Sequence, residues 1–551
     1  MTLLKTSLAV FFRRFPTSIE QSPTSYSLWL SAFVALIFTR LLVESWLFGF
    51  ESHALSFLVF EWMHTFSFFL LSFLLFLPLI QFFARVSMQV ASTVLLFGFL
   101  IILTPPIIDF VISDGKGLWS FYIFDGLSGL LSRYFTFFGD RPDMGITYGV
   151  RVEVAVVTIA FGLFVFAKTK DFFRALFAML SSYTLLFFLG TFPSWVTLIV
   201  HLFMGLTLDF RSTDVATIFL SPTPIFSREM VDFRSALNMK MSLIYVSLLP
   251  ILVGVKLFIC DRTLFLALFR NARLPQIAYH VGLLCVGMGL GAFLRKVNGG
   301  INAFDVLAVW CLLIAVVCAW LASVVSNDCF DECIDQETNG DRPLPTKTIS
   351  RSLYIAIGVS FFLASILASA LVSVKATLLL VAYQMLAWMY SVPPFRLKRF
   401  PILATFVSAI ASVLILCAGF VLFSPSGTMQ ELPFSLLALF VISYTVSLPL
   451  KDFKDTRGDR GDGVYTLPVL LGESLAKLFV GSGIFLSYVA SVFVLHESML
   501  FLSAVICGGW SFWVVWNMRE TPSRITPRTI FWWVFAGVFL YGVIVALTVM
   551  R

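Results

Sequence analysis

Two clusters of acidic side chains follow long apolar stretches of this sequence, and their spacing suits metal binding. The first reads N-D-C-F-D-E-C-I-D from Asn327 to Asp335. If the preceding helix continues through it, Asp328, Asp331 and Asp335 lie on one helix face at i, i+3 and i+7, beside Asn327. Three carboxylates so close together repel one another and are costly near hydrocarbon unless a cation compensates them.

The second cluster reads K-D-F-K-D-T-R-G-D-R from Lys451 to Arg460, with Asp455 and Asp459 at i and i+4. Two such clusters suit Mg²⁺, which prefers oxygen ligands and is usually held by one or two carboxylates together with substrate phosphates. A diphosphate bridged between the clusters is the natural third partner. The alternative is that acidic helix ends are solvated loop starts. That alternative explains one cluster well, but it explains two clusters with interleaved Lys and Arg poorly.

The composition requires a membrane protein to position these clusters. Of the 551 residues, 59% are hydrophobic and 13% are charged, against about 45–50% and about 25% in soluble domains. Apolar runs of about 20 residues recur along nearly the whole chain. These runs are apolar on all sides and so exclude an outer-membrane barrel, whose strands alternate apolar and polar residues. We therefore predict an all-α polytopic membrane protein. The net charge of +7 reflects a bias between loops and not nucleic-acid binding.

The chain divides into two parts, which we predict to be domains of residues 1–270 and 271–551. The second part contains nine predicted spans at residues 278–294, 303–326, 350–371, 376–392, 401–423, 433–450, 475–494, 498–516 and 530–549. The first part contains five to seven predicted spans, near residues 27–48, 55–83, 88–113, 148–167, 175–206 and 241–260, with a weaker one at 118–138.

The first part carries fewer signals of chemistry. Glu61 and His64 lie at i and i+3 within an apolar stretch, and ionisable groups inside a membrane are candidate functional residues. The alternative is that they pair with each other or reach the membrane interface. We expect this part to serve as a scaffold, a wall on the acceptor side or a docking module for a protein partner.

The basic residues of the second part predict which loops face the cytoplasm. The loops on one side of the nine spans carry 17 Lys and Arg residues, and those on the other side carry four. By the positive-inside rule, the loops that contain both acidic clusters are cytoplasmic.

Five sequence strings resemble the UbiA superfamily of intramembrane prenyltransferases. They are N-D-x-x-D-x-x-x-D from Asn327 to Asp335, D-R-P-L-P from Asp341 to Pro345, Y-S-V-P-P-F-R-L-K from Tyr390 to Lys398, D-x-x-x-D from Asp455 to Asp459, and T-L-P-V from Thr466 to Val469. Their order on nine spans makes the match specific for residues 275–551. We recognise no family for residues 1–270.

The resemblance implies a nine-helix bundle with both acidic motifs at its cytoplasmic end. It implies that an isoprenoid diphosphate donor loses its diphosphate with the help of Mg²⁺, and that the allylic cation alkylates a lipid or aromatic acceptor. Asp328, Asp331, Asp455 and Asp459 then become catalytic residues. The metal site adds Asn327 and Asp335. The expected substrate contacts are Asn327, Arg342, Tyr390, Lys398 and Lys451.

An aromatic wall would stabilise the allylic cation, and Trp310, Tyr383, Trp388 and Phe406 are candidates for it, although packing explains each of them as well. Two other functions stay open. The same fold can transfer a phosphoribosyl group to a polyprenyl phosphate. A transporter could use the acidic clusters as an ion path, but such paths place charge near the bilayer midplane, often on broken helices.

Overall fold

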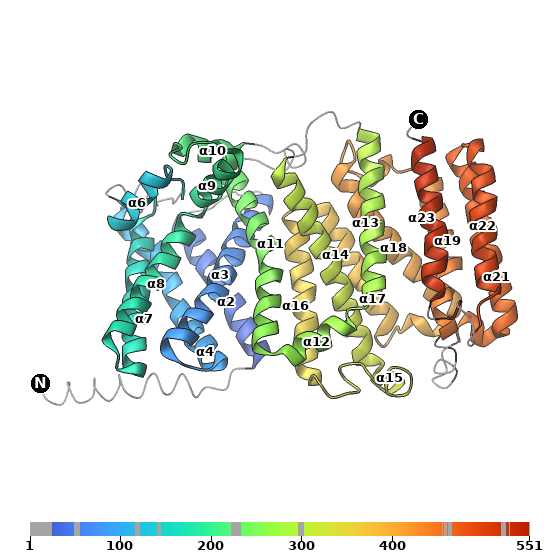
Figure 1. The fold of residues 1–551 in the computed structure, drawn as a ribbon, viewed down its shortest axis with the longest axis horizontal. Coiled ribbons are helices and arrows are strands. Elements are labelled where there is room, and N and C mark those ends of the chain that lie inside the picture. The colour runs from blue at the N-terminus through green and yellow to red at the C-terminus, as the bar shows by residue number, and fades with distance from the viewer. Residues whose placement is uncertain are drawn as a thin grey trace, which may run out of the picture. The chain divides into compact units, whose positions relative to one another are not determined.

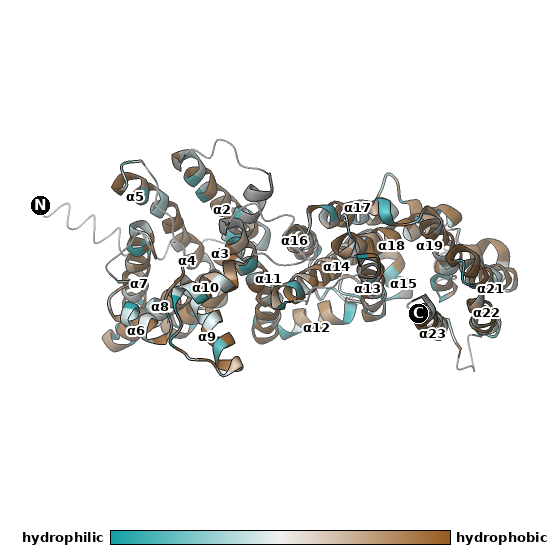
Figure 2. Cartoon of the chain, turned by 90° about the horizontal axis from the view of Figure 1, so that it is seen from above, coloured by the Kyte–Doolittle hydropathy of each residue, from teal (hydrophilic) through white to brown (hydrophobic). Residues whose placement is uncertain are grey.

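The computed structural model describes residues 25–48, 55–115, 122–139, 145–221, 233–295, 302–454, 456, 460, 465–519, 525–527 and 529–549. All regular elements within these ranges are helices. Fourteen of them are long and apolar enough to cross a membrane, and apolar residues predominate along the helices (Figure 2). The prediction of an all-α polytopic membrane protein is therefore confirmed.

The chain folds as two compact units (Figure 1). Unit 1 comprises Met1–Arg262 with Ile301–Ala308, and unit 2 comprises Thr263–Gly300 with Val309–Arg551. The division of the chain into functional domains at residue 270 stays a prediction.

Unit 1 contains six of the candidate spans. Its helices are α2 (Tyr26–Phe48), α3 (Leu55–Ala84), α4 (Met88–Gly98), α5 (Thr104–Ile112), α6 (Leu127–Phe135), α7 (Tyr148–Thr169), α8 (Phe172–Gly190), α9 (Phe192–Met204), α10 (Ser212–Leu220) and α11 (Phe233–Cys260).

Two expectations for unit 1 need correction. The predicted span 175–206 is two helices, α8 and α9, because the chain breaks at Thr191 and Pro193 begins the first turn of α9. The weaker prediction at 118–138 contains only the nine-residue α6 within the described ranges, which is too short to cross a bilayer.

Unit 2 holds eight further candidate spans. Its helices are α12 (Arg262–Asn271), α13 (Leu274–Arg295), α14 (Ala303–Phe330), α15 (Glu332–Thr338), α16 (Arg351–Ala370), α17 (Val374–Ser391), α18 (Pro401–Phe423), α19 (Phe434–Ser447), α21 (Leu467–Leu495), α22 (Phe501–Trp516) and α23 (Ile530–Val549). The ninth predicted span, residues 376–392, forms helix α17. This helix is not one of the candidate spans, and its 18 residues include Lys375 and the buried Gln384.

Helix α18 forms the centre of unit 2 and packs closely against α13. Of the residues in its most apolar stretch, 78% are buried, which is the highest share among the candidate spans. A Cβ atom added to Gly287 of α13 would lie 1.9 Å from the carbonyl oxygen of Leu416, and one added to Gly419 of α18 would lie 2.2 Å from that of Leu284. The two backbones can approach this closely only because both positions lack a side chain, as is common between helices in membranes.

The polar end of unit 2 collects the segments that the sequence singled out. Helices α12 and α15 lie at the same end of the unit (Figure 1). The 3₁₀ turn Leu397–Arg399 precedes α18 and carries Lys398 and Arg399. The 3₁₀ turn Leu448–Lys454 follows α19 and carries Lys451 and Lys454.

Candidate active site

The first acidic motif lies on two helices joined at Asp331. Helix α14 ends at Phe330, Asp331 has φ −109° and ψ 13°, and α15 begins at Glu332. The hydrogen bonds continue across the break, because the Asp331 N–H donates to the Asn327 carbonyl at 3.0 Å. The expected uninterrupted helix face is therefore wrong in this detail. Asp328 and Asp335 share one partner, Arg342, whereas Asp331 contacts Arg396 and Lys398.

Asp328 is buried within a set of hydrogen-bond donors from three other segments. Its side chain is 2% exposed. Oδ1 accepts from the Arg273 guanidinium at 2.5 Å, while Oδ2 accepts from Asn271 Nδ2 at 2.7 Å and from the Tyr354 hydroxyl at 2.9 Å. These partners fix the carboxylate and compensate its burial.

Arg342 joins the two ends of the motif. Its NH1 atom donates to Asp328 Oδ1 at 3.3 Å and also contacts Asp335 Oδ2. Burial raises the pKa of the Asp335 carboxyl, and the nearby Arg342 guanidinium opposes that rise. Arg342, predicted as a substrate contact, thus lies between two predicted metal ligands.

Asp331 contacts the loop that follows α17. Lys398 Nζ contacts Asp331 Oδ1, and the Arg396 guanidinium lies 3.4 Å from the same oxygen. Burial lowers the pKa of the Lys398 ammonium, and the Asp331 carboxylate opposes that decrease. Burial therefore disfavours the charged forms of both the Asp335 carboxyl and the Lys398 ammonium. A bound multivalent ligand would compensate that cost.

The loop after α17 is shaped to present these cations. The Ser391 hydroxyl, on the last residue of α17, donates to Asn327 Oδ1 at 3.0 Å. Arg396 has φ 41°, a left-handed conformation, and its N–H donates to the Val392 carbonyl at 2.9 Å. This turn directs residues 396–398 back toward the first motif.

Tyr390 and Lys451 connect the same loop with the segment that leads into the second motif. The Lys451 ammonium lies 5.0 Å from the centre of the Tyr390 ring and donates to its hydroxyl at 3.1 Å. The cation–π contact holds the lysine at the end of α17. Three of the predicted strings therefore meet at one end of unit 2, with Asn327, Tyr390, Lys398 and Lys451 among the residues that join them.

Asp455 and Asp459 lie outside the described residues. Within the described ranges, no three His, Cys, Asp or Glu side chains are arranged to hold a metal ion. The chemistry of the donors still fits Mg²⁺, because Asp328, Asp331 and Asp335 offer carboxylate oxygens, the ligands that this ion prefers. Each of these carboxylates is currently matched by Arg or Lys.

The four candidates for an aromatic wall divide into two groups. Trp310, Trp388 and Phe406 are 47%, 44% and 42% exposed, and they remain candidates only as apolar surface. Tyr383 is buried, and its hydroxyl donates to His280 Nε2 at 3.1 Å. The His280 tautomer follows from Nδ1, which lies 2.6 Å from the Gln276 carbonyl and must donate to it.

Four residues of the site were not predicted: Asn271, Arg273, Tyr354 and Arg396. Arg273 and Arg396 were recognised only as members of basic joints between spans, and charge bias does not assign a partner. Asn271 ends the short α12 and Tyr354 lies in the first turn of α16. Their roles depend on the tertiary contact with Asp328, which no local pattern indicates.

Comparison with known proteins identifies relatives of the second part of the chain. Residues 283–542 match the model of the UbiA prenyltransferase family, which confirms the resemblance seen in the motifs. The digeranylgeranylglyceryl phosphate synthase of Thermococcus sibiricus is 25% identical over 228 residues, which are 40% of this chain and 75% of that protein. The chloroplastic chlorophyll synthase of Oryza sativa is 29% identical over 205 residues, or 36% of this chain and 52% of that protein. A solved UbiA homologue from Archaeoglobus fulgidus, bound to GPP and Mg²⁺, is 18% identical with a TM-score of 0.41, covering 50% of this chain and 96% of that one.

Proposed function

Because residues 283–542 match the UbiA prenyltransferase family, we propose that this multi-pass membrane protein transfers a prenyl group from an isoprenoid diphosphate to a lipid or aromatic acceptor. Loss of the diphosphate is assisted by Mg²⁺. The observation that carries the proposal is the pairing of a buried carboxylate motif with cations from separate segments. These cations are Arg273, Arg342, Arg396 and Lys398.

The pairing is suited to an exchange of partners on substrate binding. The motif carboxylates are the ligands for the metal, together with Asn327 and with Asp455 and Asp459 of the second motif. With the carboxylates holding the metal, the arginine and lysine side chains that now pair with them would be available to bind diphosphate oxygens. A planar guanidinium binds such oxygens through two parallel hydrogen bonds.

The chain's own residues then bind the donor and exclude water from its reacting carbon. Bound Mg²⁺ supplies Lewis-acid stabilisation of the charge that develops on the leaving diphosphate. Lys398 and Arg396 neutralise the same charge from the loop after α17, and Tyr390 offers a phenolic donor beside them. The apolar interior of unit 2 excludes water, which would otherwise capture the allylic cation.

The positions of the charges favour this enzyme over a transporter. Asp328 lies in the last turn of α14, Asp331 follows it, and Asp335 lies in α15, so the cluster occupies a helix end. An ion path would need such groups near the middle of the bilayer. The relatives are named for different products, so they support prenyl transfer in general and leave the acceptor undefined.

The proposal is tested with the purified full-length protein in detergent, labelled geranylgeranyl diphosphate, Mg²⁺ and a lipid extract of the host membrane. We expect release of diphosphate together with transfer of label to an organic-soluble product. Asp331→Asn should abolish both, whereas Glu332→Gln, at the neighbouring half-buried position that pairs with Arg351 and not with the motif's cations, should retain them. No diphosphate release from geranyl, farnesyl or geranylgeranyl diphosphate would contradict the proposal.

A further inference from the structure

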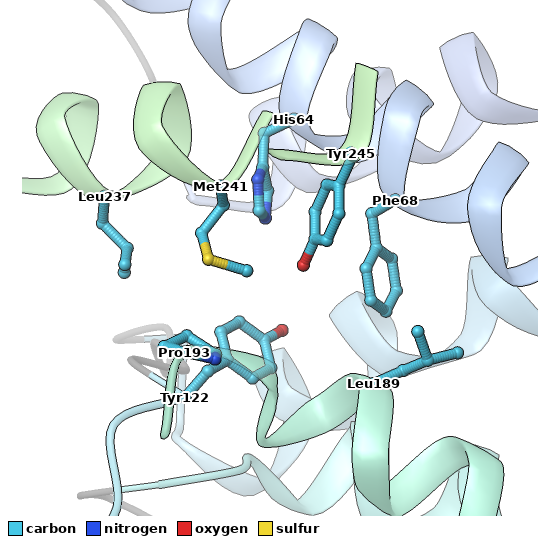
Figure 3. Close-up of a pocket in the computed structure, with 8 residues that line it drawn as sticks. All are labelled: His64, Phe68, Tyr122, Leu189, Pro193, Leu237, Met241 and Tyr245. Carbon is cyan, nitrogen blue, oxygen red and sulfur yellow. The ribbon is translucent and has the colours of Figure 1, made fainter. Parts of the chain in front are cut away.

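The cavity in unit 1 is too small for an organic ligand. It lies between α3, α9 and α11, with His64 and Tyr245 among its lining residues (Figure 3). Its volume of about 30 Å³ is room for one or two water molecules. The stronger candidate for an interaction site is a surface of unit 2, the outer face of helix α12.

Helix α12 is a short amphipathic helix at the polar end of unit 2. Its ten residues, Arg262–Asn271, span about 15 Å at 1.5 Å per residue, which is about half the thickness of the hydrocarbon core. The helix runs crosswise to α13 and α14, at the end of the unit where α15 lies (Figure 1). An amphipathic helix in this position lies in the interface between hydrocarbon and water.

One face of α12 is fixed to the protein. Leu264, Ala267 and Leu268 pack against an apolar cluster from α14, α16 and the segment before α16. Asn271, the last residue of the helix, donates from the same face to Asp328 Oδ2 at 2.7 Å. These four positions are spaced at i, i+3, i+4 and i+7, so they form one inner face and leave the opposite face free of these contacts.

The opposite, outer face of α12 combines aromatic rings with arginine. The Phe265 and Phe269 rings stack with their centroids 6.2 Å apart, and the Phe269 side chain is 53% exposed. Arg262 and Arg270, at the two ends of this continuous helix, are exposed, and no ion pair holds either of them within the described part of the chain. The helix contains no acidic residue, and the single Asp261 before it leaves a net positive charge.

An anionic phospholipid matches both parts of this outer face. Its phosphate lies at the depth of the interface, where a guanidinium can bind the oxygens through two parallel hydrogen bonds. Its acyl chains cover exposed aromatic rings, which prefer the apolar side of the interface. An acidic protein would also pair with the arginines, but the bilayer beside the helix already covers the rings without it.

We propose that the outer face of α12 binds anionic phospholipids of the membrane that surrounds the protein. Arg262 and Arg270 each bind a headgroup phosphate, and the two phenylalanine rings contact the acyl chains. Because Asn271 at the end of the same helix binds Asp328, the lipid contact lies on an element that supplies a partner of the carboxylate motif. The lipid site does not rest on the prenyl transfer proposed above.

The test places the full-length protein in nanodiscs of phosphatidylcholine or of an equal mixture with phosphatidylglycerol, with the same acyl chains in both. Hydrogen exchange of the α12 amides, followed by mass spectrometry, reports where the anionic lipid binds. We expect about fivefold slower exchange or more in the mixture, which is the effect of one arginine near an anionic surface. Arg262→Gln combined with Arg270→Gln should remove the difference between the two kinds of disc.

A matched variant and a matched ligand separate this site from a general effect of charge. Lys168→Gln combined with Lys170→Gln removes the same charge from the exposed end of α7 and should keep the slower exchange of α12. Glycerophosphoglycerol, the headgroup without acyl chains, should not slow exchange when it is added to phosphatidylcholine discs.

Three results would each overturn the proposal. The first is equal exchange of α12 in the two kinds of disc for the wild type, which is also the result expected if a protein partner occupies this face. The second is an equal loss of protection in the lysine variant. The third is the same protection by the free headgroup, which would exclude a lipid as the occupant.

Discussion

The ammonium of Lys398 contacts Oδ1 of Asp331, 67 residues earlier in the chain. The contact links the loop between α17 and α18 with the break between α14 and α15. Both side chains are 10% exposed, so little water screens the pair. In the function proposed above, Asp331 would hold Mg²⁺ and this loop cation would bind the diphosphate of the donor.

Removal of Lys398 should therefore affect donor binding more than chemistry. We expect Lys398→Ala to raise the apparent donor KM about tenfold or more, the loss of one charge-assisted contact, with a smaller change in kcat. Arg399→Ala removes an exposed cation from the adjacent position and should leave KM near the wild-type value. Steady-state kinetics at varied geranylgeranyl diphosphate measures both. An unchanged KM for Lys398→Ala would remove the lysine from the diphosphate site.

Asp328 provides a second test, because its carboxylate lies among the donors Arg273, Asn271 and Tyr354. Asp328→Asn keeps the volume but removes the negative charge, so we expect at least a hundredfold loss of kcat. The neutral amide leaves the Arg273 cation uncompensated, and the melting temperature should also fall by a few degrees. Asp328→Ala should destabilise the protein more, since it also loses the hydrogen bonds. Activity near the wild-type level in Asp328→Asn would exclude this carboxylate as a metal ligand.

The sequence predicted the helical fold because each span must satisfy its own backbone in lipid, so apolar length alone identifies it. It failed where a helix ends for local reasons. Thr191 and Pro193 divide one apolar stretch into α8 and α9, and Asp331 interrupts the expected continuous face. In both places the apolar pattern continues while the backbone turns.

The candidate site was predictable in part for a similar reason. Asp331, Tyr390 and Lys398 stand in strings with recognisable spacing. Asn271 and Tyr354 carry no such pattern, and only the packing of α12 and α16 beside α14 brings them to Asp328. Long-range contacts of this kind depend on tertiary structure, which residue spacing does not encode.

The close contact between α13 and α18 predicts a sharp difference between two glycines of one helix. Gly287→Ala would place a Cβ 1.9 Å from the Leu416 carbonyl oxygen, whereas nothing lies within 4 Å of a Cβ at Gly289. We expect Gly287→Ala to destabilise unit 2 by about 1–3 kcal/mol, the usual cost of overpacking. Gly289→Ala should be neutral or slightly stabilising, since alanine favours a helix. Thermal unfolding in detergent compares them, and equal melting temperatures would contradict the packing.

Metal removal should silence the enzyme reversibly. Treatment with EDTA is expected to reduce diphosphate release to background, and excess Mg²⁺ should restore it, because the motif carboxylates would be left paired with Arg and Lys. Asp335→Asn should raise the Mg²⁺ concentration needed for half-maximal activity, and the variant should keep the fold of the wild type. Full activity after exhaustive EDTA dialysis, checked by elemental analysis, would show that the reaction needs no metal.

The last prediction concerns the side of the membrane on which the donor binds. The charge bias predicts that the first motif faces the cytoplasm. A diphosphate must reach the motif from water, because hydrocarbon cannot replace its hydration. Cys333 lies in α15 and is exposed, so it reports the location of the motif directly.

With the other cysteines replaced, we expect a membrane-impermeant maleimide to label Cys333 in inverted vesicles but not in intact cells. Excess geranylgeranyl diphosphate with Mg²⁺ should slow the labelling, because the donor would bind beside Asp331 and Asp335. Cys260, which is also exposed, serves as the comparison, since donor should not protect it when it is the single remaining cysteine. Labelling of Cys333 from outside intact cells would reverse the predicted orientation and require the donor to arrive from the opposite face.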